Sequence, residues 1–341
     1  NLLSDMIPAS SISRRRFLQG SAAGLAVLSQ LGTAASPSAS AGVRSTFSLD
    51  DTRVSFQTPA AVKSSKILFV ADTHLFRDDE RGASYSEFSG RMAKAYNETR
   101  HFRSQKATTP ETCFAETLQA ARDEKADLIV LGGDILSFPS EAGVEWVSSQ
   151  MKDTGIPWMY TAGNHDWHYE GMEGTSASLR NTWSRKRLAP FYQGKHPLMD
   201  ACDINGIRVV TLDNSTYEIE PEQLTFFRQQ VSTGQPLILC VHIPLYAPGR
   251  PVGFGCGHPA WGAASDKSHL IERRPRWRES GHTQTTLDFH REVFSAANLL
   301  GIFAGHTHKA SLDVQNGIPQ FVTAANATGA HLLVEVTPAA S

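Results

Sequence analysis

The chain has 341 residues, of which 40% are apolar and 19% are charged, and its formal net charge is −2. This balance is typical of a globular protein and excludes a chain that is disordered throughout. A near-neutral charge argues against nucleic acid as a partner, because proteins that bind it are usually strongly basic. We also expect no stable membrane span, because no uninterrupted apolar run approaches the ~20 residues that one requires.

Residues 1–41 have the pattern of an export signal. The basic cluster Arg14-Arg15-Arg16 precedes Phe-Leu, a weakly apolar stretch and then small residues up to Ala41. These three regions, in this order, make up a secretory signal. Paired arginines before Phe-Leu resemble a twin-arginine signal, which routes folded proteins across the bacterial inner membrane. We therefore expect the twin-arginine export machinery as a partner and a periplasmic or secreted location, with a disordered basic tail as the alternative.

Residues 42–62 are polar with short strand-like pieces, and we predict an N-terminal linker there. The main domain is predicted over residues 63–338. It contains short, continuous apolar runs, which are typical of buried strands. The runs are Lys66–Ala71, Asp127–Leu131, Pro157–Thr161, Leu237–Val241 and Leu299–Ala304.

Amphipathic patterns between several of these runs predict helices. They cover residues 112–125, 143–152, 221–230 and 286–297. The alternation of strands and helices predicts the α/β fold class. Residues 311–335 instead predict short strands, with a turn at Asn316-Gly317.

Two segments of the domain have the character of insertions. Residues 77–109 are polar and are expected to contain one exposed helix, and residues 248–281 are rich in Gly, Pro and Arg. Long loops of this kind often cover functional sites, so we expect substrate selectivity to lie in them. The arginines at 273, 274, 276 and 278 leave two alternatives, a clamp for a second anionic group or a solvated loop.

Each predicted strand ends in a polar cluster. The clusters contain Asp72 and His74, then Asp134, then Asn164, His165 and Asp166, then His242, and finally His306 and His308. In α/β folds, ligands bind beyond the carboxyl ends of the strands, where all of these residues lie. In each D-x-H or H-x-H pair, strand periodicity lets both side chains point the same way, at one ion. Carboxylate, imidazole and amide groups without thiolate suit Mn, Fe, Zn or Co.

At these residues the chain resembles the calcineurin-like metallophosphoesterase superfamily. The family pattern is D-x-H, G-D, G-N-H-(D/E), a lone His and G-H-x-H, and all five blocks occur in order from Asp72 to His308. The resemblance implies a four-layer α-β-β-α sandwich of the metallo-dependent phosphatase type, with two central sheets flanked by helices. It also implies an enzyme that hydrolyses the mono- or diester of a small phosphorylated substrate.

The resemblance further implies a binuclear metal centre. Asp72, His74 and His308 would bind one metal, Asn164, His242 and His306 the other, and Asp134 would bridge them; these are the predicted ligands. Two cations about 3.5–4 Å apart can clamp the attacking and leaving oxygens of a phosphoryl group, and a metal-bound hydroxide attacks phosphorus in line.

His165 and Asp166 are the predicted catalytic residues. By resemblance, His165 is not a ligand but lies over the phosphate, where it stabilises charge or protonates the leaving group. We expect Asp166 to orient the His165 ring through a hydrogen bond. The following residues, Trp167, His168 and Tyr169, either line the substrate pocket or anchor the loop.

Two further points bear on the type of protein. Purple acid phosphatases carry Gly where this chain has His74 and add a tyrosine ligand in a D-x-x-Y block, which is absent here. A tyrosinate charge-transfer site is therefore not expected. The alternative to an enzyme is a non-catalytic metal-binding scaffold on the same fold, and the presence of His165 favours the enzyme.

Overall fold

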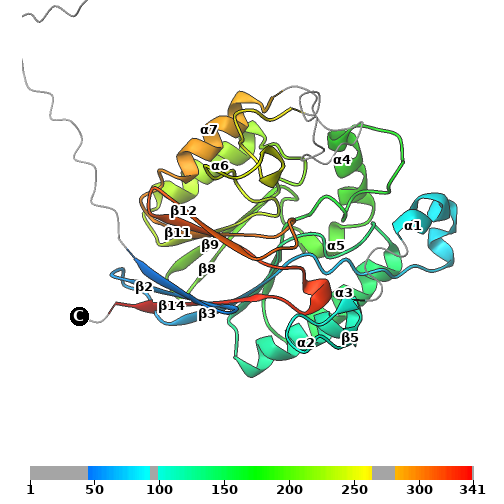
Figure 1. Ribbon diagram of the computed structural model, residues 1–341, viewed down its shortest axis with the longest axis horizontal. Helices are drawn as coiled ribbons and strands as arrows, with labels where there is room; N and C mark the ends of the chain where they lie inside the picture. Colours follow the sequence, from blue (N-terminus) through cyan, green and yellow to red (C-terminus); the bar gives the residue numbers. More distant parts are fainter. Residues whose placement is uncertain (1–44, 93–98, 263–280, 340–341) are drawn as a thin grey trace, which may run out of the picture. The chain divides into compact units, whose positions relative to one another are not determined.

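Two six-stranded sheets form the centre of the molecule (Figure 1). The first sheet has the order β1 (Thr46–Asp50), β2 (Arg53–Thr58), β14 (Leu332–Pro338), β3 (Ser65–Val70), β6 (Leu128–Leu131) and β7 (Trp158–Tyr160). The second has the order β12 (Ser311–Gln315), β13 (Ile318–Val322), β11 (Leu299–Ala304), β10 (Leu237–Cys240), β9 (Ile207–Leu212) and β8 (Met199–Ile204). This computed structural model describes residues 45–92, 99–262 and 281–339. The predicted export signal and the four arginines between 273 and 278 lie outside these residues.

The strands that precede the polar clusters run parallel within each sheet. In the first sheet, β3 pairs with β6 and β6 with β7. In the second, β10 lies between β9 and β11. Parallel strands end at the same edge of a sheet, so the loops that follow them come together there.

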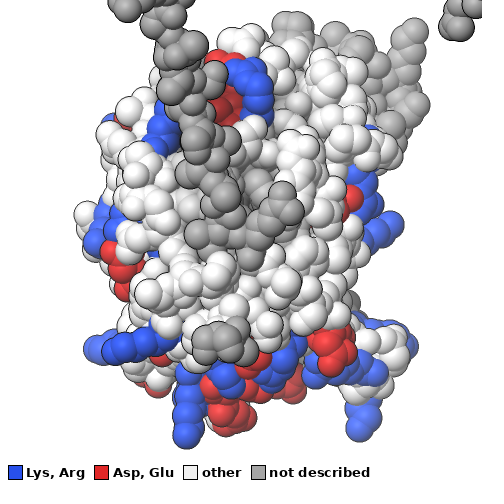
Figure 2. Space-filling view, turned by 90° about the vertical axis from the view of Figure 1, so that its left-hand side faces the viewer, with Lys and Arg blue, Asp and Glu red and all other residues white. Residues whose placement is uncertain are grey.

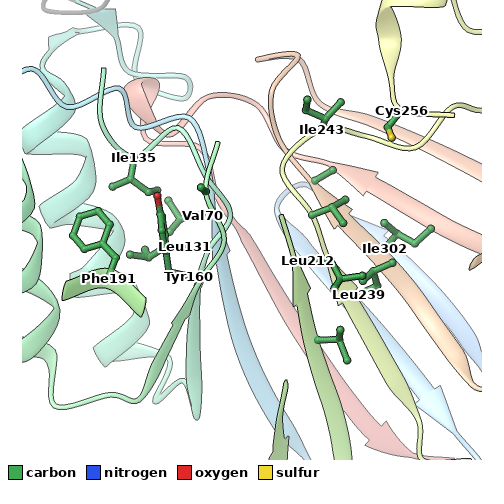
Figure 3. Packing of buried hydrophobic residues seen from close by; sticks show 14 of the residues in the cluster. Val70, Leu131, Ile135, Tyr160, Phe191, Leu212, Leu239, Ile243, Cys256 and Ile302 are labelled. Carbon is green, nitrogen blue, oxygen red and sulfur yellow. The ribbon is translucent and has the colours of Figure 1, made fainter. Parts of the chain in front are cut away.

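The central strands β3, β6, β10 and β11 are buried on both faces, which explains why they are continuous apolar runs. On β3, Ile67 and Phe69 pack between the two sheets with Phe303, while Leu68 and Val70 belong to the core on the helix side. Between the sheets, the rings of Phe303 and Phe321 stack with centroids 5.2 Å apart. Figure 3 shows part of the other core, whose labelled side chains lie beside both sheets.

Helices cover the outer faces and complete the four layers (Figure 1). α2 (Pro110–Asp123), α3 (Glu141–Thr154), α4 (Ser176–Lys186) and α5 (Ala189–Tyr192) accompany the first sheet, and α6 (Pro221–Ser232) and α7 (Gln284–Val293) the second. The ends of α3 follow ordinary capping chemistry. Ser140 accepts a hydrogen bond from Gly143 N, and Gly155 ends the helix at φ 67°. The predicted four-layer α/β sandwich is therefore confirmed.

The four predicted helices are present as α2, α3, α6 and α7, with ends shifted by a few residues. The C-terminal strands and the Asn316-Gly317 turn are also present, because β12 and β13 form an antiparallel hairpin there. α4 was not predicted. Its apolar face consists mainly of Leu179 and Trp183, which is too little for a clear helical period.

Residues 42–62, predicted as a linker with short strand-like pieces, contribute two strands to the first sheet. β1 and β2 form a hairpin, and β2 pairs in parallel with the C-terminal strand β14. The predicted insertion 77–109 contains η1 (Glu80–Tyr85), α1 (Ser86–Met92) and a small hairpin of β4 (Thr99–Arg100) and β5 (Ala107–Thr108). Short 3-10 turns also occur as η2 (Val252–Phe254) and η4 (Asn326–Thr328).

Charged side chains lie at the surface in mixed groups. Figure 2 shows basic and acidic side chains intermingled along the lower part of one face. One such group joins the first sheet to the end of α2, where Glu124 binds Arg53 at 2.7 Å and Lys66 at 2.8 Å. None of the helices in the described part of the chain is long and apolar enough to cross a membrane.

Candidate metal centre

The loops after five strands meet at one edge of the sheets and bring the predicted ligands together. Asp72 and His74 follow β3, Asp134 follows β6, Asn164 follows β7, His242 follows β10, and His306 and His308 follow β11. Asp72, His74 and His242 are fully buried, Asp134 and Asn164 are 1% exposed, and His306 and His308 are partly buried. Buried polar groups are rarely gathered in this number unless they bind one another or a ligand.

The backbone at these positions is unusual. The residues with left-handed conformation are Asp72 (φ 58°), His74 (φ 51°), Asp134 (φ 50°), His306 (φ 68°) and His308 (φ 57°). Strand periodicity was predicted to point the side chains of each D-x-H or H-x-H pair at one ion. That reason was wrong, because β3 and β11 end before these pairs begin. Tight left-handed turns direct the side chains instead. Such strain persists only where the surroundings impose it, and it is concentrated at functional sites.

Three groups of side chains are placed to bind a cation, each with one potential ligand atom per residue within 4.8 Å of the others. They are Asp72, His74 and His308; His74, Asp134 and His165; and Asp134, His242 and His306. In the first group, His308 Nε2 lies 2.9 Å from His74 Nε2 and 3.4 Å from Asp72 Oδ1. In the last, His242 Nε2 lies 3.2 Å from Asp134 Oδ2.

The carboxylates fit a metal-binding role. Asp72 Oδ2 accepts a hydrogen bond from His306 N at 2.8 Å, but the buried Oδ1 accepts none of good geometry. Asp134 Oδ1 accepts a hydrogen bond from His165 N at 2.7 Å. The other carboxylate oxygen, Oδ2, faces His242 Nε2 at 3.2 Å. A buried carboxylate oxygen without a donor costs on the order of 1–3 kcal/mol, which a bound cation would offset. The donor set contains no thiolate and fits the borderline metals expected from the sequence.

Glycine is required beside Asp134. A Cβ on Gly163 would lie 2.2 Å from Asp134 N and Oδ1, and one on Gly133 would lie 2.6 Å from His242 Nδ1. Gly133 also has φ 92°, where other residues are strained. The glycines of the G-D and G-N-H blocks therefore let the loops after β6 and β7 approach each other closely enough to assemble the centre.

The structure places His165 beside the predicted ligand His74, and it places Asp166 among the loops that carry the ligands. The His165 ring lies 4.9 Å from that of His74, centroid to centroid. The carboxylate of Asp166 accepts hydrogen bonds from Leu136 N, Gly163 N and Tyr160 Oη at 2.8, 2.8 and 2.9 Å. We expected Asp166 to orient the His165 ring, but these bonds instead tie together the loops that carry the ligands.

A family model described as calcineurin-like phosphoesterase matches residues 65–310, which include every predicted ligand. The chain belongs to the calcineurin-like phosphoesterase family. Members of this family are metal-dependent, which agrees with the clustered donors described above.

Two curated relatives of this calcineurin-like chain are described as probable cyclic nucleotide phosphodiesterases. The protein from Psychrobacter arcticus is 22% identical over 209 residues, 60% of this chain and 64% of the relative. The protein from Rhodococcus erythropolis is 27% identical over 148 residues, 41% of this chain and 40% of the relative. The chain thus spans less than two thirds of the length of these relatives. A dimetal phosphatase structure from Danio rerio aligns with 78% of this chain and 91% of its own, at 11% identity and TM-score 0.49.

The histidines of the candidate metal centre differ in the direction of their pKa shifts. Burial lowers the pKa of both His74 and His306 to about 3, so both are neutral and have a lone pair for a metal. Burial also opposes the charged form of His242, but the charges of Asp134 and Asp72 outweigh it and raise its pKa to about 10. In return, His242 helps to hold the pKa of Asp134 well below its usual value, against the effect of burial.

We expect metal binding at pH 7 to release at least one proton. His242 is charged at that pH in the metal-free protein, whereas a histidine ligand must be neutral. The apparent metal affinity should therefore rise by about tenfold per pH unit between pH 7 and pH 10 if one proton is released. Calorimetric titration with Mn²⁺ in two buffers of different ionisation enthalpy measures the proton count. Identical heats in both buffers would contradict the prediction.

Several residues that support the loops escaped the sequence analysis. Asn214 bonds both backbone groups of Ile243, next to His242, at 2.9 and 2.7 Å. Thr73 lies between Asp72 and His74 in the sequence, and its Oγ1 donates a hydrogen bond to Asn326 Oδ1 at 3.0 Å. Thr73 and Asn326 are 253 positions apart, so no local pattern could have indicated the pair.

The aromatic residues after the G-N-H-D block anchor their loop. Trp167, His168 and Tyr169 are all at most 1% exposed. Trp167 Nε1 donates to Ser215 Oγ at 2.8 Å, and Tyr169 stacks on Tyr85 of the 77–109 insertion with centroids 5.1 Å apart. Of the two alternatives left open by the sequence, this burial favours the anchor.

Proposed function

We propose that this protein is an exported phosphoesterase with a binuclear metal centre. The observation that carries the binuclear proposal is the position of Asp134, which belongs to two of the three groups of potential ligands. A carboxylate shared in this way can bind two cations and offset their repulsion. When bound, the two cations would supply Lewis acidity, neutralising charge on the phosphoryl group and activating a water molecule.

The residues of the chain divide the remaining work. Asp72, His74 and His308 would bind one cation, and Asn164, His242 and His306 the other. Asp166 fixes the loop that carries Asn164 and His165 through its bond to Gly163 N. His165 is the group without an assigned metal, and we propose that it stabilises the phosphate or delivers a proton to the leaving oxygen.

Phosphodiesters, including cyclic nucleotides, are the substrate class that we propose first. The support is the description of the two curated relatives as probable cyclic nucleotide phosphodiesterases, together with the family match. Phosphate monoesters are the alternative within the same chemistry. A non-catalytic metal-binding scaffold is the alternative outside it.

The test compares initial rates on bis-para-nitrophenyl phosphate, para-nitrophenyl phosphate and 3′,5′-cyclic AMP, with Mn²⁺ added to the purified protein. We expect the diesters to be cleaved faster than the monoester. Faster monoester cleavage would overturn the diester proposal but keep the phosphoesterase. Two bound metals without turnover of any of these esters would favour the scaffold.

Export by the twin-arginine route is a proposal from the sequence, since residues 1–41 lie outside the described part of the structure. Replacing Arg14 and Arg15 with Lys should trap the precursor inside the cell, whereas Arg16→Lys, which keeps the pair, should not. Cell fractionation and immunoblotting would distinguish the precursor from the processed form. Normal export of the double variant would point to the general secretory route.

A further inference from the structure

Tyr217 is a buried aromatic residue outside every motif that defines the family. It lies in the loop between β9 and α6, is 1% exposed and has φ 62°. A left-handed backbone is a genuine outlier for a bulky residue and costs on the order of 1–3 kcal/mol. The surrounding structure therefore holds Tyr217 in this conformation against a local preference.

A stack of aromatic rings, the Tyr217 stack, provides that support. The Tyr217 ring stacks on Trp261 with centroids 4.4 Å apart, and Trp261 stacks on His282 at 4.8 Å. Glu218, the next residue in the chain, binds His282 Nδ1 at 3.1 Å and Thr283 N at 3.0 Å. The stack thus joins the loop after β9 to the residues just before α7 and fixes the direction of the Tyr217 hydroxyl.

That hydroxyl meets a predicted metal ligand. Tyr217 Oη lies 2.6 Å from His306 Nε2, and the two rings are nearly perpendicular, at 82°. The backbone N–H of His306 donates a hydrogen bond to Asp72 Oδ2. Among the described residues, no hydrogen bond engages the other ring nitrogen, Nδ1.

The contact with Tyr217 bears on which ring nitrogen of His306 carries the proton. A neutral imidazole has one N–H donor and one lone pair, so the nitrogen that binds a metal forces the proton onto the other. Histidine ligands usually donate that second N–H to an oxygen, which fixes the tautomer and the ring orientation. A nitrogen occupied by a hydroxyl at 2.6 Å has no lone pair to offer a cation while it carries the proton.

We propose that Tyr217 is a positioning residue for His306. Its hydroxyl oxygen accepts the Nε2–H of His306, so that Nδ1 is the nitrogen offered to the cation that Asp134 and His242 also bind. The inference rests on the proposed metal-dependent function. It assigns to the Tyr217 stack a role in setting the affinity of one metal position, which the family motif alone does not specify.

The test is Tyr217→Phe in the full chain, which removes the hydroxyl and keeps the stacking ring. Tyr192→Phe is the matched control, because Tyr192 is also buried and its hydroxyl bonds only a serine hydroxyl, Ser184 Oγ, among the described residues. Zn²⁺ affinities from competition with a chelator should fall about 10–100-fold at one position in Tyr217→Phe and remain unchanged in the control. Equal affinities in wild type and Tyr217→Phe would overturn the proposal.

Long-range ¹H–¹⁵N spectra of the zinc-loaded wild type provide a readout that a purely structural role would not affect. We expect His306 to carry its proton on Nε2 and its metal on Nδ1, and the opposite tautomer would overturn the assignment even if the affinity falls. A wild type that binds no Zn²⁺ would overturn the proposed function as well. If the wild type binds two metals and Tyr217→Phe binds them with the same affinity, this inference alone is overturned.

Discussion

Replacing Asp134 with Ala is expected to release metal from both positions and reduce phosphoester hydrolysis to background. The Asp134 carboxylate is common to two groups of potential ligands and is the main negative charge beside His242. Its other oxygen binds His165 N, so the loop that carries the proposed proton donor also loses a support. Metal content by mass spectrometry and initial rates on a diester measure the two effects.

A second variant separates chemistry from folding. Asp134→Asn keeps the volume and an oxygen that can accept from His165 N, but it removes the charge. It should remain folded and still lose metal and activity. Asp203→Asn is the matched control, because Asp203 binds Arg208 near the end of β8, outside the centre. Two-metal occupancy with a normal rate in Asp134→Asn would refute the bridging role.

His165→Ala is expected to keep both metals and to lower the rate by about 10²–10⁴-fold, the usual contribution of a positioned acid or base. The loss should be larger for esters with alkyl leaving groups than for para-nitrophenyl esters, because a poor leaving group needs the proton more. A series of esters that differ in leaving-group pKa measures this trend.

The placement of His165 also defines the outcome that would contradict this role. Its ring belongs to a group with His74 and Asp134 that could itself bind a cation. Loss of one metal in His165→Ala would make His165 a ligand rather than a catalytic residue. His196→Ala, at an exposed surface position, is the control for removal of an imidazole.

Local sequence was sufficient for most of the elements. The apolar runs that became β3, β6, β7, β10 and β11 are buried on both faces, so their composition alone distinguishes them. α2, α3, α6 and α7 each have an apolar face. The strand-like pieces predicted within residues 42–62 correspond to β1 and β2, but their place in the sheet depends on pairing with β14 at the other end of the chain, which no local pattern shows.

The sequence by itself determined which apolar runs form the central strands, and it predicted which residues after their ends would bind metal. Only the tertiary structure decided how those donors are directed: the left-handed turns at Asp72 and Asp134, the bonds of Asp166 to neighbouring loops, and the Tyr217 contact with His306. The physical reason is the separation of the contacting residues along the sequence. A buried strand is a run of successive apolar residues, whereas these contacts join loops that meet only after two sheets have packed together.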